Sequence, residues 1–125
     1  MPKSVLLVED NAAIRRALCR IFMSEANLEV CGEAENGQEG IEKAQELRPD
    51  LIVMDLSMPV MNGLVAARIL KTLMPKVPLI VFSEYSDMFS EQEVRSAGVS
   101  ALVSKFDHVS VLLGKARALL HDVAA

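Results

Sequence analysis

The sequence predicts an α/β protein in which a doubly wound, five-stranded parallel sheet carries helices on both faces. Short apolar runs of strand length alternate with longer segments whose apolar residues recur at helical spacing. Four of the five runs are apolar throughout, which is typical of strands buried on both faces of a parallel sheet. The five runs are Val5–Val8, Leu28–Cys31, Leu51–Met54, Leu79–Phe82 and Ala101–Val103.

The first half of the chain supplies two strand–helix units. A helix is predicted from Asn11, because the apolar residues that follow share one face, and Asn27 marks its exit. Leu28–Cys31 alternates apolar and polar residues, which predicts a half-exposed edge strand. An Asn-Gly turn then precedes a second helix over residues 38–47, which ends before Pro49.

The second half supplies three further helices. Apolar residues at helical spacing predict one helix over 64–73 and another over 109–120. The helix between them, from Ser86 to Ala97, has few apolar positions and is closed by Gly98. Five alternating units of this kind predict a flavodoxin-like sheet of order 2-1-3-4-5, with the ligand site where the first and third strands end side by side.

Composition limits the functions to consider. The 125 residues leave room for one core, so we expect a single domain over 1–125, with an aliphatic interior because aromatic residues make up only 4%. The net charge of −4 and scattered basic residues argue against direct nucleic-acid binding. No apolar run reaches transmembrane length, and Cys19 and Cys31 do not form a disulfide framework. We expect a cytoplasmic domain with no membrane contact.

Reactive side chains follow four of the apolar runs at the same end. Glu9 and Asp10 follow the first run, Asp55 the third and Ser83 the fourth, while Lys105 comes two residues after the fifth. Three crowded carboxylates repel one another unless a cation compensates, and hard oxygen ligands suit Mg²⁺. A lysine and a hydroxyl can hold phosphate oxygens. Each residue alone could be a cap or a surface group, but their shared placement predicts a phosphoryl-transfer site.

The D-L-S-M-P-V-M-N-G run from Asp55 to Gly63, with these strand-end residues, resembles the receiver domain of two-component response regulators, including the chemotaxis regulators. The resemblance covers residues 3–120. It implies a phosphorylation-activated signalling switch in a phosphorelay, in which Asp55 accepts the phosphoryl group of a sensor histidine kinase or a phosphotransfer protein. It also implies that Lys105 and Ser83 hold the phosphate oxygens.

The resemblance further implies a metal cofactor. Mg²⁺, or Mn²⁺ in its place, would bind Asp10, Asp55 and the backbone carbonyl of Ser57, with Glu9 assisting directly or through water. Such a domain promotes only its own phosphorylation and dephosphorylation, so we do not expect an enzyme.

Two positions depart from the family pattern. Leu102 stands where an aromatic switch residue is usual, and Phe106 stands where a proline often follows Lys105, so we predict a trans Lys105–Phe106 bond. We expect the output to pass through Ser83 and Leu102 to the surface of the fourth helix, fifth strand and fifth helix, a candidate surface for homodimerisation or partner docking. Tyr85 either shields the phosphoryl group from water or lies on the fourth helix.

Two other functions are alternatives to a phosphorylated switch. A receiver-like adaptor that binds partners without phosphorylation is disfavoured by the intact Asp10, Asp55 and Lys105. A metal-dependent phosphatase with an aspartyl-phosphate intermediate characteristically carries a second aspartate two residues after its nucleophile, and Ser57 occupies that position here.

Overall fold

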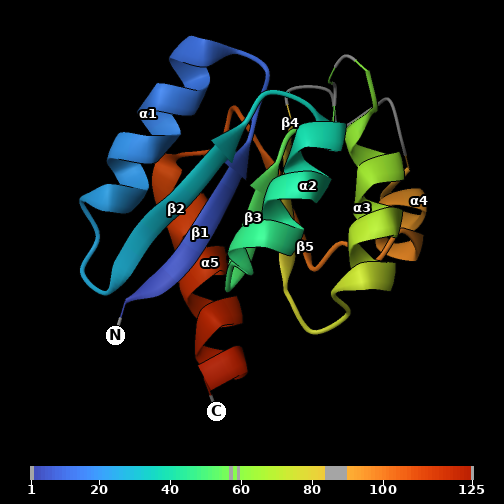
Figure 1. The fold of residues 1–125 in the computed structure, drawn as a ribbon. Helices are drawn as coiled ribbons and strands as arrows, with labels where there is room; N and C mark the ends of the chain where they lie inside the picture. The colour runs from blue at the N-terminus through green and yellow to red at the C-terminus, as the bar shows by residue number, and fades with distance from the viewer. Residues whose placement is uncertain (1, 57, 59, 84–89, 125) are drawn as a thin grey trace.

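The computed structural model describes residues 2–124 except 57, 59 and 84–89, and its elements follow the predicted alternation (Figure 1). The strands are β1 (Lys3–Val8), β2 (Leu28–Ala34), β3 (Leu51–Met54), β4 (Leu79–Ser83) and β5 (Ala101–Ser104). The helices are α1 (Ala12–Met23), α2 (Gly37–Leu47), α3 (Gly63–Leu73), α4 (Glu91–Ser96) and α5 (Val109–Ala124).

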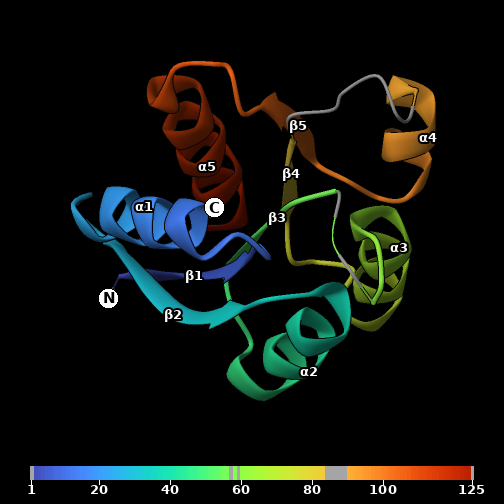
Figure 2. The same cartoon turned by 90° about the horizontal axis from the view of Figure 1, so that it is seen from above.

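The strands form one parallel sheet in the order β2-β1-β3-β4-β5, which confirms the predicted topology and makes β2 an edge strand. Helices α1 and α5 cover one face, and α2, α3 and α4 cover the other (Figure 2). Val8 pairs with Met54 at the ends of β1 and β3. The acidic residues that follow these two strands therefore leave the sheet next to each other.

The core consists of two aliphatic clusters, one on each face of the sheet. Alternate residues of the central strands supply both, because successive side chains of a strand point to opposite faces. In β1, Leu6 and Val8 pack toward α2 and α3, while Val5 and Leu7 pack toward α1 and α5. All four side chains are buried. The fully apolar runs in the sequence thus reflect burial on both faces.

Four helices begin at a polar cap that the sequence makes visible. The side chains of Asn11, Asn36, Asn62 and Ser90 each accept a hydrogen bond from the backbone N–H three residues later. Such caps satisfy one of the amide groups that have no partner inside a helix. Asn11 directly follows Asp10, and Asn62 ends the loop that follows Asp55, so these caps also define where the loops around the site stop.

Several boundaries in the structure differ from the predicted ones, including the end of α1 and the end of β2. Helix α1 ends at Met23, and Asn27 instead adopts a left-handed conformation (φ 66°) in the turn before β2. Strand β2 continues to Ala34, because a register shift opposite Val5 and Leu6 interrupts the alternation from which its end was predicted.

The predicted helix from Ser86 to Ala97 is wrong at its start. Ser90 is extended and forms a capping box with Glu93, so α4 begins at Glu91. Residues 86–89 lie outside the described residues. Gly98 follows the helix with φ +89°, as predicted for a closing glycine.

Among the described residues, no helix combines the length and the apolar character that a membrane span requires.

Candidate functional site

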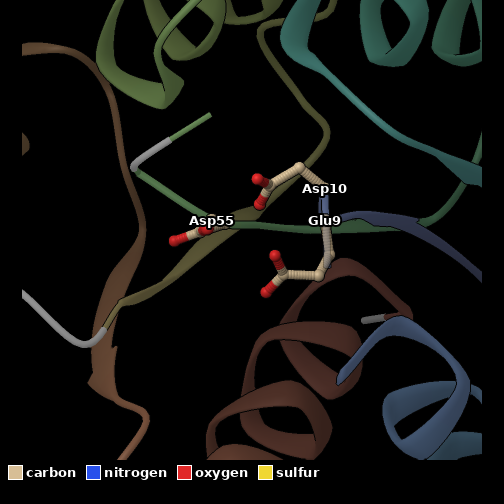
Figure 3. Close-up of side chains that lie close together, drawn as sticks. All are labelled: Glu9, Asp10 and Asp55. Carbon is tan, nitrogen blue, oxygen red and sulfur yellow. The ribbon is translucent and has the colours of Figure 1, made fainter. Parts of the chain in front are cut away.

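Three carboxyl groups meet at the carboxyl edge of the sheet (Figure 3). Glu9 and Asp10 come from the end of β1 and Asp55 from the end of β3, and each offers an oxygen within 4.8 Å of the others. The amide of Asp55 donates to the carbonyl of Val8 at 3.0 Å, which extends the β1–β3 pairing by one residue and holds the acids side by side. Asp10 is exposed, whereas Glu9 and Asp55 are only 1% and 5% exposed.

Lys105 brings a cation to the acids from the end of β5. Its Nζ lies 2.7 Å from Oε1 of Glu9 and 3.4 Å from Oδ2 of Asp55, so the lysine is closer to the glutamate than to the aspartate. Its backbone amide donates to the carbonyl of Ser83 at 2.9 Å. Ser83, buried at the end of β4, thus lies beside the lysine segment. The structure brings together the described acidic residues and the lysine that the sequence predicted.

Burial and neighbouring charges raise the pKa values of two groups at the site. Burial raises the pKa of Glu9 from 4.5 to about 7, with the nearby Asp10 and Asp55 adding to the rise while Lys105 and the amide of Asn11 oppose it. Burial opposes the charge on Lys105, but the hydrogen bond to Glu9 and the charge of Asp55 outweigh it, so the pKa of Lys105 is raised above 10.5. Perturbed groups of this kind are common at functional sites.

The loop between β3 and α3 is held close to Asp55. The amide of Gly63 donates to the carbonyl of Leu56 at 2.7 Å. A Cβ on Gly63 would lie 2.3 Å from the backbone oxygen of Asp55, a distance that real Cβ atoms do not reach. Glycine is therefore required here for the close approach of two backbone segments. Ser57, predicted to supply a metal-binding carbonyl, lies outside the described residues.

Sequence reasoning missed the role of Arg15. Arg15 belongs to α1, and its mostly buried guanidinium donates to the backbone carbonyl of Glu9 at 2.8 Å and pairs with Glu33 of β2 at 3.3 Å. These contacts fix the backbone that carries the two acids. An arginine five residues after Asp10 was the available signal, but its partner on β2 becomes visible only when the sheet is assembled.

The departures from the family pattern have different outcomes. The described residues contain no cis peptide bond, so Lys105–Phe106 is trans, as predicted. Leu102 is half-buried and packs against the core cluster on the α2–α4 face. It also lines a pocket of about 480 Å³ between α4, β5 and α5. Tyr85 lies outside the described residues.

The donor set fits a divalent cation. Three carboxylates against one lysine leave net negative charge at a largely buried position, and the oxygens lie close enough to share one ion. Oxygen ligands of this kind are those that Mg²⁺ prefers, commonly together with water and a phosphate. The arrangement can therefore bind a cation and a phosphoryl group together.

Known proteins share this arrangement. A family model for the response regulator receiver domain matches residues 5–117. The chain is 38% identical to the chemotaxis protein CheY of Thermotoga maritima over 105 residues, which cover 84% of this chain and 87% of that protein. The response regulator domain of Thermotoga maritima CheB superposes with a TM-score of 0.89 at 30% identity, covering 97% of this chain and 98% of that one.

Longer proteins also contain a matching region. The chain is 38% identical, over 125 residues, to protein-glutamate methylesterase/protein-glutamine glutaminase 4 of Hahella chejuensis. The match covers 98% of this chain but only 32% of that relative. Since the family model spans nearly all of the sheet and the relatives match across it, the chain belongs to the response-regulator receiver domain family.

Proposed function

We propose that this domain is a phosphorylation-activated signalling switch in which Asp55 is the phosphoacceptor. The observation that carries the proposal is the meeting of Asp55 with Glu9, Asp10 and Lys105 at one edge of the sheet. Asp55 follows the central strand β3, and one of its carboxylate oxygens lies 3.4 Å from Nζ of Lys105. The phosphodonor is a histidine-phosphorylated kinase or phosphotransfer protein, or a small acyl phosphate.

The transfer needs little covalent chemistry from the protein. An Oδ of Asp55 attacks the phosphorus, the new O–P bond forms, and the P–N bond of the donor's phosphohistidine breaks. The imidazole leaves with the bonding electron pair and takes up a proton. Lys105 donates to a phosphoryl oxygen, and the hydroxyl of Ser83 donates to another. Catalysis then consists of positioning and charge neutralisation.

Asp10 and Asp55 would hold a Mg²⁺ ion, with Glu9 adding negative charge beside it; Mn²⁺ can replace it. A cation held there would neutralise charge on the phosphoryl oxygens and on the attacking carboxylate. Removal of the metal with a chelator should therefore stop labelling without unfolding the domain.

Incubation with acetyl phosphate and Mg²⁺ tests the proposal by intact-mass spectrometry. The chain should gain one phosphate, and Asp55→Asn should abolish the gain. Asp107→Asn, which changes an exposed aspartate of the β5–α5 loop, is the matched control and should label normally. Full labelling of Asp55→Asn would refute the assignment. Rapid multiple turnover of acetyl phosphate without stable label would indicate a phosphatase instead, and no labelling at all would indicate an adaptor.

The output surface is proposed at α4, β5 and α5. The pocket beside Leu102 supports this location, because it lies on that surface and Leu102 both lines the pocket and packs against the core. Its lining residues are Val94, Arg95, Val99, Ser100, Ala101, Leu102 and Lys115. A second copy of the chain or another protein would dock here. Sedimentation of the chain with and without beryllofluoride and Mg²⁺ distinguishes the two.

A further inference from the structure

Asp10 is the carboxylate of the site that packing restrains least. It is exposed, whereas Glu9 and Asp55 are buried. Glu9 is still paired with β2, because its amide donates to the carbonyl of Ala34 at 2.9 Å. The orientation of Asp10 therefore depends on the peptide group that joins it to Glu9. The carbonyl oxygen of that peptide group is the acceptor for Arg15.

Arg15 reaches back to this peptide group from the first turns of α1. Its backbone amide donates to the carbonyl of Asn11 at 2.9 Å, and its Nη1 donates to the carbonyl oxygen of Glu9 at 2.8 Å. The side chain is 14% exposed, so the second hydrogen bond is largely shielded from water. It fixes the peptide plane immediately before Asp10, and with it the direction in which the Asp10 side chain leaves the backbone.

A bulge in β2 brings Glu33 to the same face of the sheet as α1. The pairing with β1 passes from Val30 directly to Gly32. Cys31 packs against the core cluster on the α2–α4 face, and a Cβ on Gly32 would meet a side chain of α2, so two successive residues share that face. Glu33 consequently points to the other face, toward α1. Bulges near functional sites commonly redirect a side chain in this way.

Glu33 holds the guanidinium of Arg15 in place. Nε of Arg15 lies 3.3 Å from Oε1 of Glu33, and Nη2 lies 3.9 Å from Oε1 of Glu35. Each nitrogen of the planar guanidinium thus has its own partner, an arrangement that the single ammonium of a lysine cannot reproduce. The edge strand β2 therefore sets the position of the guanidinium, and the guanidinium sets the peptide plane before Asp10.

We infer that Arg15 is a positioning residue for the divalent cation and that Glu33, placed by the bulge in β2, completes this role. The inference rests on the proposed function, which requires the cation. Charge and positioning predict opposite effects here. A positive charge near three acids weakens cation binding, so on charge alone the loss of Arg15 strengthens it. Glu33 offsets that charge, however, so positioning dominates and the loss of Arg15 weakens cation binding.

Binding of Mn²⁺, measured from the EPR signal of the free ion, tests the inference without phosphoryl transfer. Arg15→Met should raise the Kd for Mn²⁺ about tenfold, as expected for the loss of a group that orients a metal ligand. Arg15→Lys keeps the charge but not the planar fork, and should raise the Kd similarly. Glu33→Ala should raise it by a smaller factor. The double variant should bind no more weakly than Arg15→Met, because both residues act through one contact.

Two further readouts separate positioning from a general loss of stability. Coupling between two sites is reciprocal, so Mg²⁺ should slow amide exchange at residues 33–35 in the unmodified chain but not in Arg15→Met. With acetyl phosphate as the donor, Arg15→Met should need about tenfold more Mg²⁺ for half-maximal labelling, and most of the loss should be recovered at saturating Mg²⁺.

Arg16→Met is the matched control, because it removes the same charge from the next, exposed residue of α1 and should leave the Kd unchanged. Mn²⁺ binding by Arg15→Met that is unchanged or tighter overturns the inference, and so does Arg15→Lys with the Kd of the unmodified chain. Should Arg15→Met fail to fold in urea titrations, Glu33→Ala decides, and an unchanged Kd with full protection of residues 33–35 overturns the inference. An unmodified chain that binds Mn²⁺ but is not labelled by acetyl phosphate refutes the proposed function instead.

Discussion

Glu9 offers a sharp test of how burial and pairing are balanced at the site. In the folded protein its pKa is raised to about 7, chiefly by burial, whereas the unfolded chain has an ordinary value near 4.5. The folded state therefore binds a proton that the unfolded state has released between these two pH values. By linkage, the contribution of Glu9 to stability is fully present below about pH 4.5 and is lost as pH rises to about 7.

The magnitude follows from the same two values. Each pH unit between them corresponds to about 1.4 kcal/mol, so the full loss is about 3 kcal/mol, and about 2 kcal/mol of it occurs between pH 5.5 and 8. Glu9→Gln cannot ionise and removes this dependence. In metal-free buffer, the free energy of unfolding of Glu9→Gln relative to the unmodified chain should therefore rise by about 2 kcal/mol from pH 5.5 to 8.

Urea unfolding with a chelator at pH 5.5, 6.5 and 8 measures this difference. Glu46→Gln, which changes an exposed glutamate of α2, is the control and should run parallel to the unmodified chain. Parallel curves for Glu9→Gln would refute the reasoning, because they would mean that Glu9 titrates alike in both states. In that case the ion pair with Lys105 would fully offset the cost of burial.

Three further predictions concern the framework around the site. Gly63→Ala should destabilise the fold by several kcal/mol and impair labelling of Asp55, because the added Cβ would meet backbone atoms. Gly114→Ala, whose Cβ would have nothing near it, should instead stabilise α5 by about 0.5–1 kcal/mol. Urea unfolding of both variants measures the difference. Ser90→Ala removes the capping box of α4 and should cost about 1 kcal/mol in the same assay. Beryllofluoride binding should change amide exchange in 83–97 and 101–106, and Leu102→Ala should blunt the change; an exchange response limited to the Asp55 loop would exclude this route.

The sequence by itself determined the order of strands and helices and most of their starts. Apolar runs buried on both faces and short polar caps such as Asn11 are local signals, because they depend on residues within one turn or one strand. The acids and the lysine could also be predicted to meet, since the carboxyl ends of parallel strands share one edge. Asp10, Asp55 and Lys105 thus follow from pattern and family resemblance.

Tertiary structure decided the features that join distant segments. Lys105 lies closer to Glu9 than to Asp55, although Lys105 and Glu9 are 96 residues apart in the sequence. The distance between Lys105 and Glu9 therefore depends on the packing of β1 against β3 and of β4 against β5. The contact of Arg15 with Glu33 depends on the register shift between β1 and β2. The left-handed turn at Val60 arises because Met58 and Met61 must both face the core. Local propensity opposes that turn, and only the surrounding packing can impose it.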